Sequence, residues 1–164
     1  MAQNQPSKAI AVIPSDTINI PVPGIITSGT NTGGATTLTD AGQDFTNATT
    51  NANGYNISGG DVVISAAGVI SEIASVDSAT QLTLLTAIAA GTYDIYKGNY
   101  QILGELEGFT LFVGTGGPAT VLRIQTLTGQ DVSLLNIPDS SFIPIQVQRV
   151  WATTTTCSNI IALQ

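Results

Sequence analysis

The clearest pattern along this chain is the alternation of hydrophobic and polar residues, which is strongest in its last third. Within residues 119–127, Leu122 and Ile124 share one face of an extended strand, and Arg123 and Gln125 share the other. A period of two residues predicts a β-strand with one buried face, because successive side chains of a strand point to opposite sides.

Two further features belong to the same pattern. Residues 128–131, Thr-Gly-Gln-Asp, have the composition of a hairpin turn, and the alternation resumes after them. It continues through Ile143, Ile145 and Val147 and then slips by one residue at 149–151. A slip of one residue predicts a β-bulge.

Short apolar stretches separated by turn-forming residues recur along the whole chain. Thr, Val and Ile are frequent, Gly and Asn separate the stretches, and the charged helix formers are scarce. The best helical candidate, residues 84–90, is short and is followed by Gly91. The sequence therefore predicts an all-β fold.

The residue composition and the spacing of the expected strands change along the chain. Residues 1–8 are polar and predict an arm, and residues 9–24 contain short strands interrupted by proline. Residues 25–97 contain short strands at close spacing, which predict a small β-barrel or sandwich. Longer alternating strands occupy residues 98–164.

Charge is unusually scarce. Charged residues make up 9% of the chain, and the formal net charge is −7, whereas soluble domains carry about 25% charged residues. So little charge favours a protein whose surface is largely covered in a permanent assembly, with a monomer surfaced by Thr, Ser and Asn as the alternative. The four cations are Lys8, Lys97, Arg123 and Arg149. Because they are few and scattered, we expect no binding of nucleic acid.

The chemistry available to the chain is limited. It has no histidine and a single cysteine, Cys157, which excludes a Ser-His-Asp or Cys-His device and an internal disulfide. Glu105 and Glu107 could in principle form an acid–base pair, but solvated strand positions explain them better. We therefore expect no catalytic residue, no cofactor and no enzyme activity.

Several aspartates lie in loops rich in Gly, Asn and Thr, where oxygen ligands for Ca²⁺ would also lie. They are Asp16, Asp40, Asp44, Asp61 and Asp77. The spacing of an EF-hand loop is absent, so turn and capping roles are the better interpretation, and we expect no metal site.

No apolar run approaches the roughly 18 residues that a membrane span requires. The first residues also lack the apolar core and basic flank of a secretory signal. We expect a protein that is made in a cytoplasm and does not enter a membrane.

Trp151 is the only tryptophan, and it lies in an apolar strand, where it suits a subunit interface or an internal core. The neighbouring Arg149 could pair with a carboxylate of another subunit or cover apolar surface with its stem. Our candidate interface residues are Trp151, Arg149, Ile143, Ile145 and Phe112.

Three segments resemble a family of small phage head proteins that includes the head-spike base of gene transfer agents. They are residues 11–17 (Ala-Val-Ile-Pro-Ser-Asp-Thr), residues 108–117 (Gly-Phe-Thr-Leu-Phe-Val-Gly-Thr-Gly-Gly) and residues 142–163, which contain Val-Gln-Arg-Val-Trp-Ala-Thr. The chain departs from the family pattern at 153–157, where the usual glycine is missing. It also departs at 25–97, where family members pass almost directly to the next strand.

The resemblance implies a small, jelly-roll-like β-sandwich core, residues 9–24 with 98–164, into which residues 25–97 are inserted as a second β-module. It implies a virion protein on the outer surface of a phage head, made in the host cytoplasm. Such a protein would be an oligomer, with a trimer expected, that binds the major capsid protein as a decoration or cement protein. A head-fibre or spike base, or a neck or tail component, is the alternative.

Overall fold

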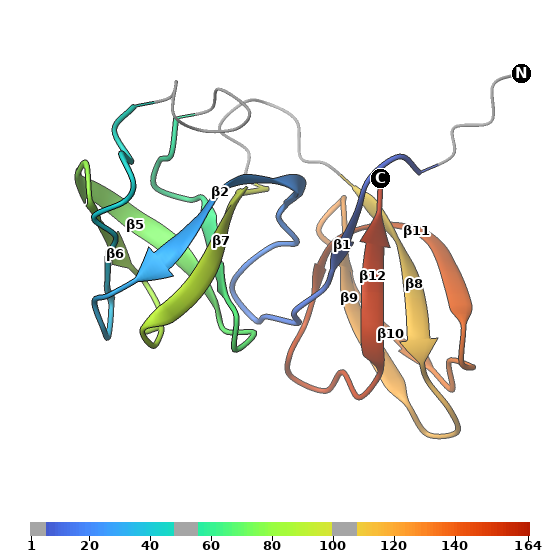
Figure 1. Ribbon diagram of the computed structural model, residues 1–164. Coiled ribbons are helices and arrows are strands. Elements are labelled where there is room, and N and C mark those ends of the chain that lie inside the picture. Colours follow the sequence, from blue (N-terminus) through green and yellow to red (C-terminus); the bar gives the residue numbers. More distant parts are fainter. Residues whose placement is uncertain (1–5, 48–55, 100–107) are drawn as a thin grey trace, which may run out of the picture. The chain divides into compact units, whose positions relative to one another are not determined.

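The computed structural model describes residues 6–47, 56–99 and 108–164 (Figure 1). Every regular element in these ranges is a β-strand, and the strands form two antiparallel sheets of six. The prediction of an all-β fold of the sandwich type is confirmed. The chain divides into two compact units, residues 1–23 with 99–164 and residues 24–98. These limits lie one residue from the division that the sequence suggested.

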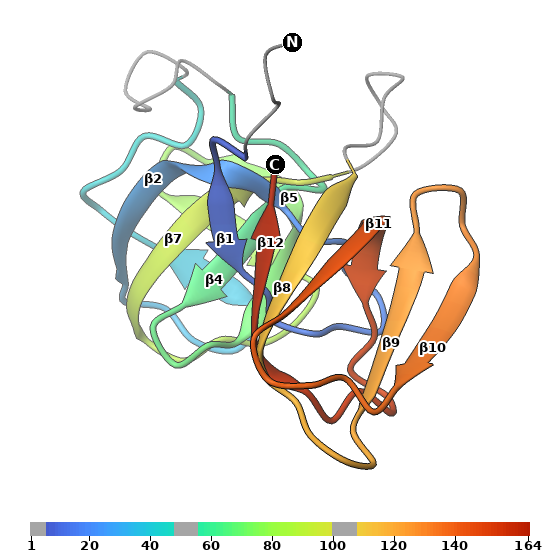
Figure 2. The ribbon, with the colours of Figure 1, turned by 90° about the vertical axis from the view of Figure 1, so that its right-hand side faces the viewer.

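The first unit contains β1 (Ala9–Ala11), β8 (Phe109–Thr115), β9 (Val121–Thr126), β10 (Asp131–Leu135), β11 (Ser141–Val150) and β12 (Ser158–Leu163). Their order in the sheet is β1-β12-β8-β11-β9-β10, so strands from the two ends of the chain are neighbours (Figure 2). The pairing extends beyond β1, because the backbone N–H groups of Ser7 and Lys8 donate to the carbonyl of Gln164 at 2.7 and 3.0 Å. This end of the predicted polar arm is therefore part of the sheet, while residues 1–5 lie outside the described residues.

Strand β11 bends and joins two layers of the first unit. Its first residues, Ser141 to Ile143, pair with β8, whereas Arg149 and Val150 pair with β9. The register shifts between Ile143 and Val147, around Pro144, and again between Val147 and Arg149. Bulges allow one strand to leave one layer and enter another. The second shift lies next to the slip in alternation that the sequence showed.

The core of the first unit lies between these layers. Side chains of β8 and β9 alternate between buried and partly exposed, as the period of two residues predicted. The residues with no exposed surface are Phe109, Leu111, Val113, Leu122, Ile124, Val147 and Ala162.

The second unit contains β2 (Val22–Asn31), β3 (Thr37–Thr39), β4 (Val62–Ser65), β5 (Ile70–Ser78), β6 (Gln81–Leu84) and β7 (Gly91–Lys97). The order is β2-β7-β4-β5-β6-β3. The two edge strands meet, because the N–H of Thr32 donates to the carbonyl of Thr39 at 2.8 Å and the N–H of Thr39 donates to Asn31 Oδ1 at 2.9 Å. These bonds draw the sheet toward a small barrel around a buried apolar cluster of Leu, Ile, Val, Phe and Tyr side chains.

The order of strands explains how one unit is inserted into the other. The first and last strands of the second unit, β2 and β7, are neighbours, so the chain enters and leaves this unit near one place. In the first unit, Asn19 Nδ2 donates to the carbonyl of Asn99 at 3.0 Å and joins the two passages of the chain. An insertion with adjacent ends closes only a short loop in the host unit, so the entropy lost is small.

Candidate interaction surface

Trp151 contacts two guanidinium groups on the outer face of the β9–β11 layer. The Cζ of Arg123 is 4.6 Å and the Cζ of Arg149 is 5.1 Å from the centroid of the indole ring. Each such cation–π contact contributes about 0.5–1 kcal/mol at an exposed site. Half of the cations of the chain therefore lie at its only tryptophan.

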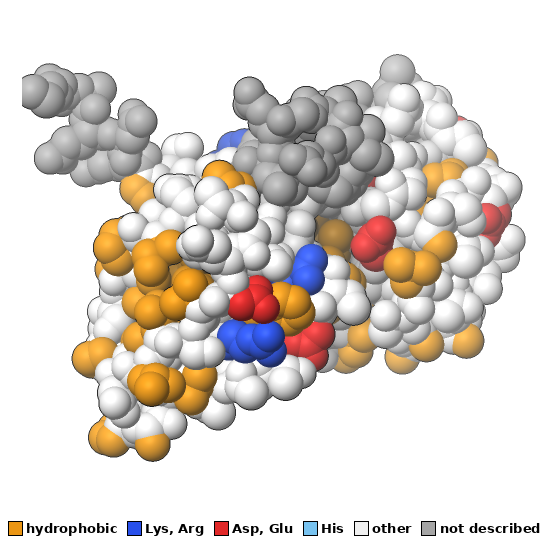
Figure 3. Space-filling view, turned by 180° about the vertical axis from the view of Figure 1, so that it is seen from behind, with side chains coloured by type: hydrophobic (Ala, Val, Ile, Leu, Met, Phe, Trp, Pro, Cys, Tyr) orange, Lys and Arg blue, Asp and Glu red, His pale blue; other side chains and the backbone are white. Residues whose placement is uncertain are grey.

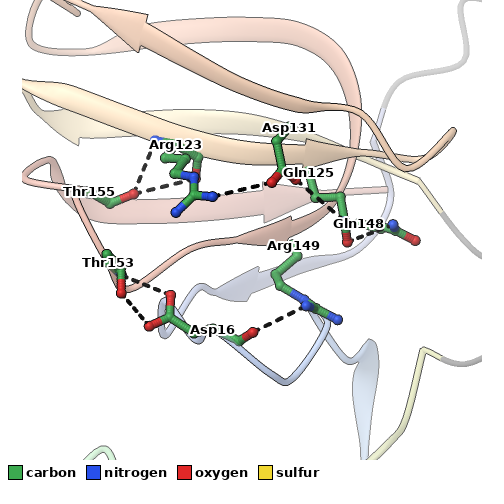
Figure 4. Close-up of polar contacts among 8 residues, drawn as sticks. All are labelled: Asp16, Arg123, Gln125, Asp131, Gln148, Arg149, Thr153 and Thr155. Atoms are coloured by element: carbon green, nitrogen blue, oxygen red, sulfur yellow. Dashed lines mark hydrogen bonds and ion pairs between the residues drawn. The ribbon is translucent and has the colours of Figure 1, made fainter.

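A polar network extends from this stack across β9, β10 and β11 (Figure 4). Arg123 Nη2 lies 3.2 Å from Asp131 Oδ2, and Gln125 Nε2 donates to the other oxygen of that carboxylate at 3.5 Å. Gln148 Nε2 donates to Gln125 Oε1 at 2.9 Å. Within the described part of the chain, Gln148 Oε1 and Trp151 Nε1 are buried without a hydrogen-bond partner.

Arg149 binds residues of its own chain. Its Nε donates to Asn19 Oδ1 at 2.9 Å, and its Nη1 donates to the carbonyl of Asp16 at 3.3 Å. Burial lowers the pKa of Arg149, while Asp131 and Asp16 oppose this change. The guanidinium that we considered for a contact with another subunit thus holds the segment 16–19 against β11.

Asp16 connects two of the segments that carry the family resemblance. Thr153 donates to its carboxylate from the backbone N–H at 2.9 Å and from the hydroxyl at 2.6 Å. The hydroxyl bond is the largest of the effects that lower the pKa of Asp16 below its ordinary value of 3.8, and the backbone bond from Thr153 is the next. The Pro-Ser-Asp-Thr segment is thereby attached to the Thr-rich turn after β11.

This contact predicts a pH dependence. Because the pKa of Asp16 is lowered by folding, its contribution to stability is complete above pH 3.8 and is lost as the pH falls through the lower, folded-state pKa. We expect the difference in unfolding free energy between wild type and Asp16→Asn to be constant near neutral pH and to shrink below pH 3.8. Denaturant unfolding from neutral pH to about pH 2 measures this difference. A difference in unfolding free energy that stays constant over the whole pH range would contradict the role given to Asp16.

The remaining predicted interface residues lie elsewhere in the first unit. Ile143 is 8% exposed and packs in the core of the unit, because β11 places it opposite the buried Leu111. Ile145 is partly buried in the bend of β11. Phe112 lies on the outer face of β8, on the other layer from Trp151 and Arg149. The five residues therefore do not form one surface.

Two exposed apolar side chains beside Phe112 were not among the predicted interface residues. Phe142 on β11 and Ile161 on β12 lie on either side of Phe112 in the sheet, and they are 51% and 37% exposed. The signal was present, because Ile143 facing the core requires Phe142 to face outward. Figure 3 shows one face of the molecule, on which hydrophobic side chains lie among uncharged ones and a group of basic and acidic side chains lies beside them.

Two of the loop aspartates, Asp40 and Asp61, bind backbone donors of the second unit. Asp40 accepts from the N–H groups of Thr30 and Gly42 at 2.8 and 2.9 Å, and from the hydroxyl of Tyr93 at 2.9 Å. Burial, followed by this carboxylate, raises the pKa of Tyr93. Asp61 similarly accepts from the N–H groups of Ser58 and Gly98. These contacts agree with the turn and capping interpretation.

Other candidate chemistry gains no support from the described ranges. Glu105 and Glu107 lie outside them. Within residues 6–47, 56–99 and 108–164, no three His, Cys, Asp or Glu side chains form a group that could hold a metal ion. In the same ranges, no helix is long and apolar enough to cross a membrane.

Comparisons with protein-family models, with curated proteins and with solved structures find no match to this chain.

Proposed function

We propose that this chain is a structural protein of a phage virion, which decorates the outer surface of the head and stabilises the lattice of the major capsid protein. The observation that carries this proposal is the resemblance of residues 11–17, 108–117 and 142–163 to small phage head proteins. All three segments belong to the first unit, and Asp16 of the first segment binds Thr153 of the third.

The scarcity of charge supports a mechanical function. Charged residues are 9% of the chain, and the described aspartates that are most buried, Asp40 and Asp61, are engaged by backbone donors of their own unit. What remains at the surface is mainly uncharged polar and apolar. Such a surface suits many modest contacts with neighbouring subunits.

Attachment to a head would then depend on many copies of the same weak contact. Three copies in a trimer would bind neighbouring capsid subunits together, so that the second and third contacts form at a high effective concentration. Weak individual contacts suffice under these conditions. Binding would add stability to the capsid lattice because a ligand that binds only the assembled form favours that form.

A second candidate function is the base of a head fibre or spike, or a neck or tail component. The separately packed second unit favours it, because its entry and exit strands β2 and β7 are neighbours and it has a core of its own. A unit attached in this way is suited to carrying a receptor-binding function without disturbing its host unit.

Addition of the purified protein to phage heads that lack it tests both candidates. A decoration protein should bind saturably, in proportion to the number of major capsid subunits, and should raise the temperature at which the heads release DNA. A spike base or neck component should saturate at a few copies per particle. Failure to bind heads, tails or complete particles would contradict both.

A further inference from the structure

Strand β10 is the last strand of the first sheet, and among the described strands only β9 lies beside it (Figure 2). Backbone bonds at the two ends of this pair fix its hydrogen-bonding pattern. The N–H of Thr126 donates to the carbonyl of Gln130 at 2.9 Å, and the N–H of Asn136 donates to the carbonyl of Thr120 at 2.9 Å. Every second pair between these two ends is therefore also hydrogen-bonded, because bonded and non-bonded pairs alternate in an antiparallel ladder.

The alternation decides which backbone groups of β10 point outward. Asp131, Ser133 and Leu135 belong to the non-bonded pairs, so their N–H and C=O groups point away from β9. Arg123 lies opposite Ser133, and its carbonyl points to the other side of β9, where it accepts from the N–H of Trp151 at 3.0 Å. We call the outward backbone groups of Asp131, Ser133 and Leu135 the open edge.

The core side of β10 is incompletely covered. Val132 lies opposite Ile124, and Leu134 lies opposite Leu122. Ile124 and Leu122 have no exposed surface, whereas Val132 and Leu134 are partly exposed. The difference arises because β9 has a strand on both sides and β10 has one on a single side. A further strand beside β10 would cover both side chains with its own apolar residues.

The other sheet edges of the chain are closed or interrupted. In the second unit, hydrogen bonds of Thr39 with Thr32 and Asn31 join the edge strands β2 and β3. In the first unit, β1 has only 3 residues, and Lys8 precedes it and Pro14 follows it. Short length, Lys and Pro prevent pairing at an edge. Strand β10 has 5 residues in a regular register, with neither Lys nor Pro among them, so its edge remains able to pair.

We propose that the open edge of β10 binds an extended segment of a partner protein, which pairs with it as an additional antiparallel strand. A helix cannot occupy this edge, because its own backbone groups are bonded internally. The residues of the segment beside Val132 and Leu134 are apolar, and the residues between them are polar and not acidic, because they lie on the side of Asp131. A second copy of β10 fits less well, because it would bring a second Asp131 and a second net charge of −7 to a short contact.

The inference deepens the proposed function by naming how a partner is held. It rests on the proposed function only for the source of the segment, which would be a capsid subunit, because pairing at β10 can be measured on the isolated chain. Binding of a strand-forming peptide without any binding to phage heads would leave the inference standing and contradict the proposed function. Binding to heads that is unaffected by a block at β10 would do the reverse.

Titration of the isotope-labelled full chain with the peptide Lys-Thr-Val-Thr-Val-Thr-Lys, followed by nuclear magnetic resonance, tests the inference. Saturable binding should shift the amide signals of the open edge and slow their hydrogen exchange. Residues opposite each other in an antiparallel pair lie on the same face, so the threonines of the peptide pair with the open edge while its valines cover Val132 and Leu134. A peptide that is N-methylated at its threonines should therefore not bind, whereas one that is N-methylated at its valines should bind.

Ser133→Pro tests the same edge from the side of the protein. Proline removes one N–H of the open edge and should weaken binding of the peptide about tenfold or more. Ser133→Thr is the matched control, because it retains this N–H and should bind as wild type does. Thermal unfolding of each variant establishes that the fold is retained, and the N-methylated peptides provide an independent test if Ser133→Pro impairs folding.

Three results would overturn the inference. The first is the absence of saturable binding at millimolar peptide, and the second is equal binding of the two N-methylated peptides. The third is self-association of wild type, measured by sedimentation velocity, that Ser133→Pro abolishes, because the occupant of the edge would then be another copy of the chain.

Discussion

Replacing Asp61 with alanine is expected to lower the free energy of unfolding of the second unit by roughly 3–5 kcal/mol. The Asp61 side chain has no exposed surface, and one of its oxygens lies 2.9 Å from Lys97 Nζ and accepts from the N–H of Gly98 at 3.1 Å. The other oxygen accepts from the N–H of Ser58 at 3.0 Å. Alanine would leave these donors facing a site without an acceptor.

The size of this effect follows from the marginal stability of small domains. A domain of this kind is stable by about 5–15 kcal/mol, so the loss of one buried carboxylate removes a large part of the total. Gly98 is the last residue of the second unit and follows β7. Asp61 directly precedes β4, so its carboxylate attaches the end of β7 to the start of β4.

Denaturant unfolding followed by circular dichroism measures the change, and Asp77→Ala is its control. Asp77 is exposed, and its hydrogen-bond donors among the described residues are the hydroxyl groups of Ser75 and Thr83, so its replacement should have a far smaller effect. Similar losses of stability in the two variants would contradict the role assigned to Asp61.

Phe109→Ala is expected to destabilise the first unit by about 3–5 kcal/mol. Phe109 has no exposed surface and lies opposite Val147, which is also fully buried, at the bend of β11. Removal of the ring takes away buried apolar area and leaves a cavity between the two layers that β11 joins.

Phe142→Ala provides a control of identical chemistry in the same unit. Phe142 is 51% exposed, so the same substitution should change stability by less than about 1 kcal/mol. Trp151, the only tryptophan, belongs to the first unit, and its fluorescence therefore reports unfolding of that unit. Phe109→Ala should shift the fluorescence transition strongly, whereas Asp61→Ala should shift mainly the circular dichroism signal. Equal effects of Phe109→Ala and Phe142→Ala would contradict the assignment of the core.

Local pattern was sufficient to predict much of the fold. The period of two residues around Leu122 and Ile124 identified a strand and its buried face, and the turn residues at 128–131 identified the hairpin that joins β9 to β10. The slip near Arg149 marked the bulge in β11. Each of these features is determined by residues that are close in the sequence, so the pattern of a single sequence can predict it.

Contacts between distant residues could not be predicted in this way. Arg149 binds Asn19, which lies 130 residues away, and the closure of the second sheet depends on the amide of Asn31 and the backbone of Thr39. The pattern identified Ile143 as apolar but did not distinguish a core residue from an interface residue. That distinction follows from pairing with the buried Leu111, a property of the assembled sheet.

The composition of purified phage particles tests the central claim most directly. On the proposal that a phage encodes this chain, quantitative mass spectrometry of that phage's purified particles should find the chain in a fixed ratio to the major capsid protein. A chain that is absent from such particles, and that remains a monomer when purified, would contradict the account of a charge-poor surface that packs against neighbouring subunits.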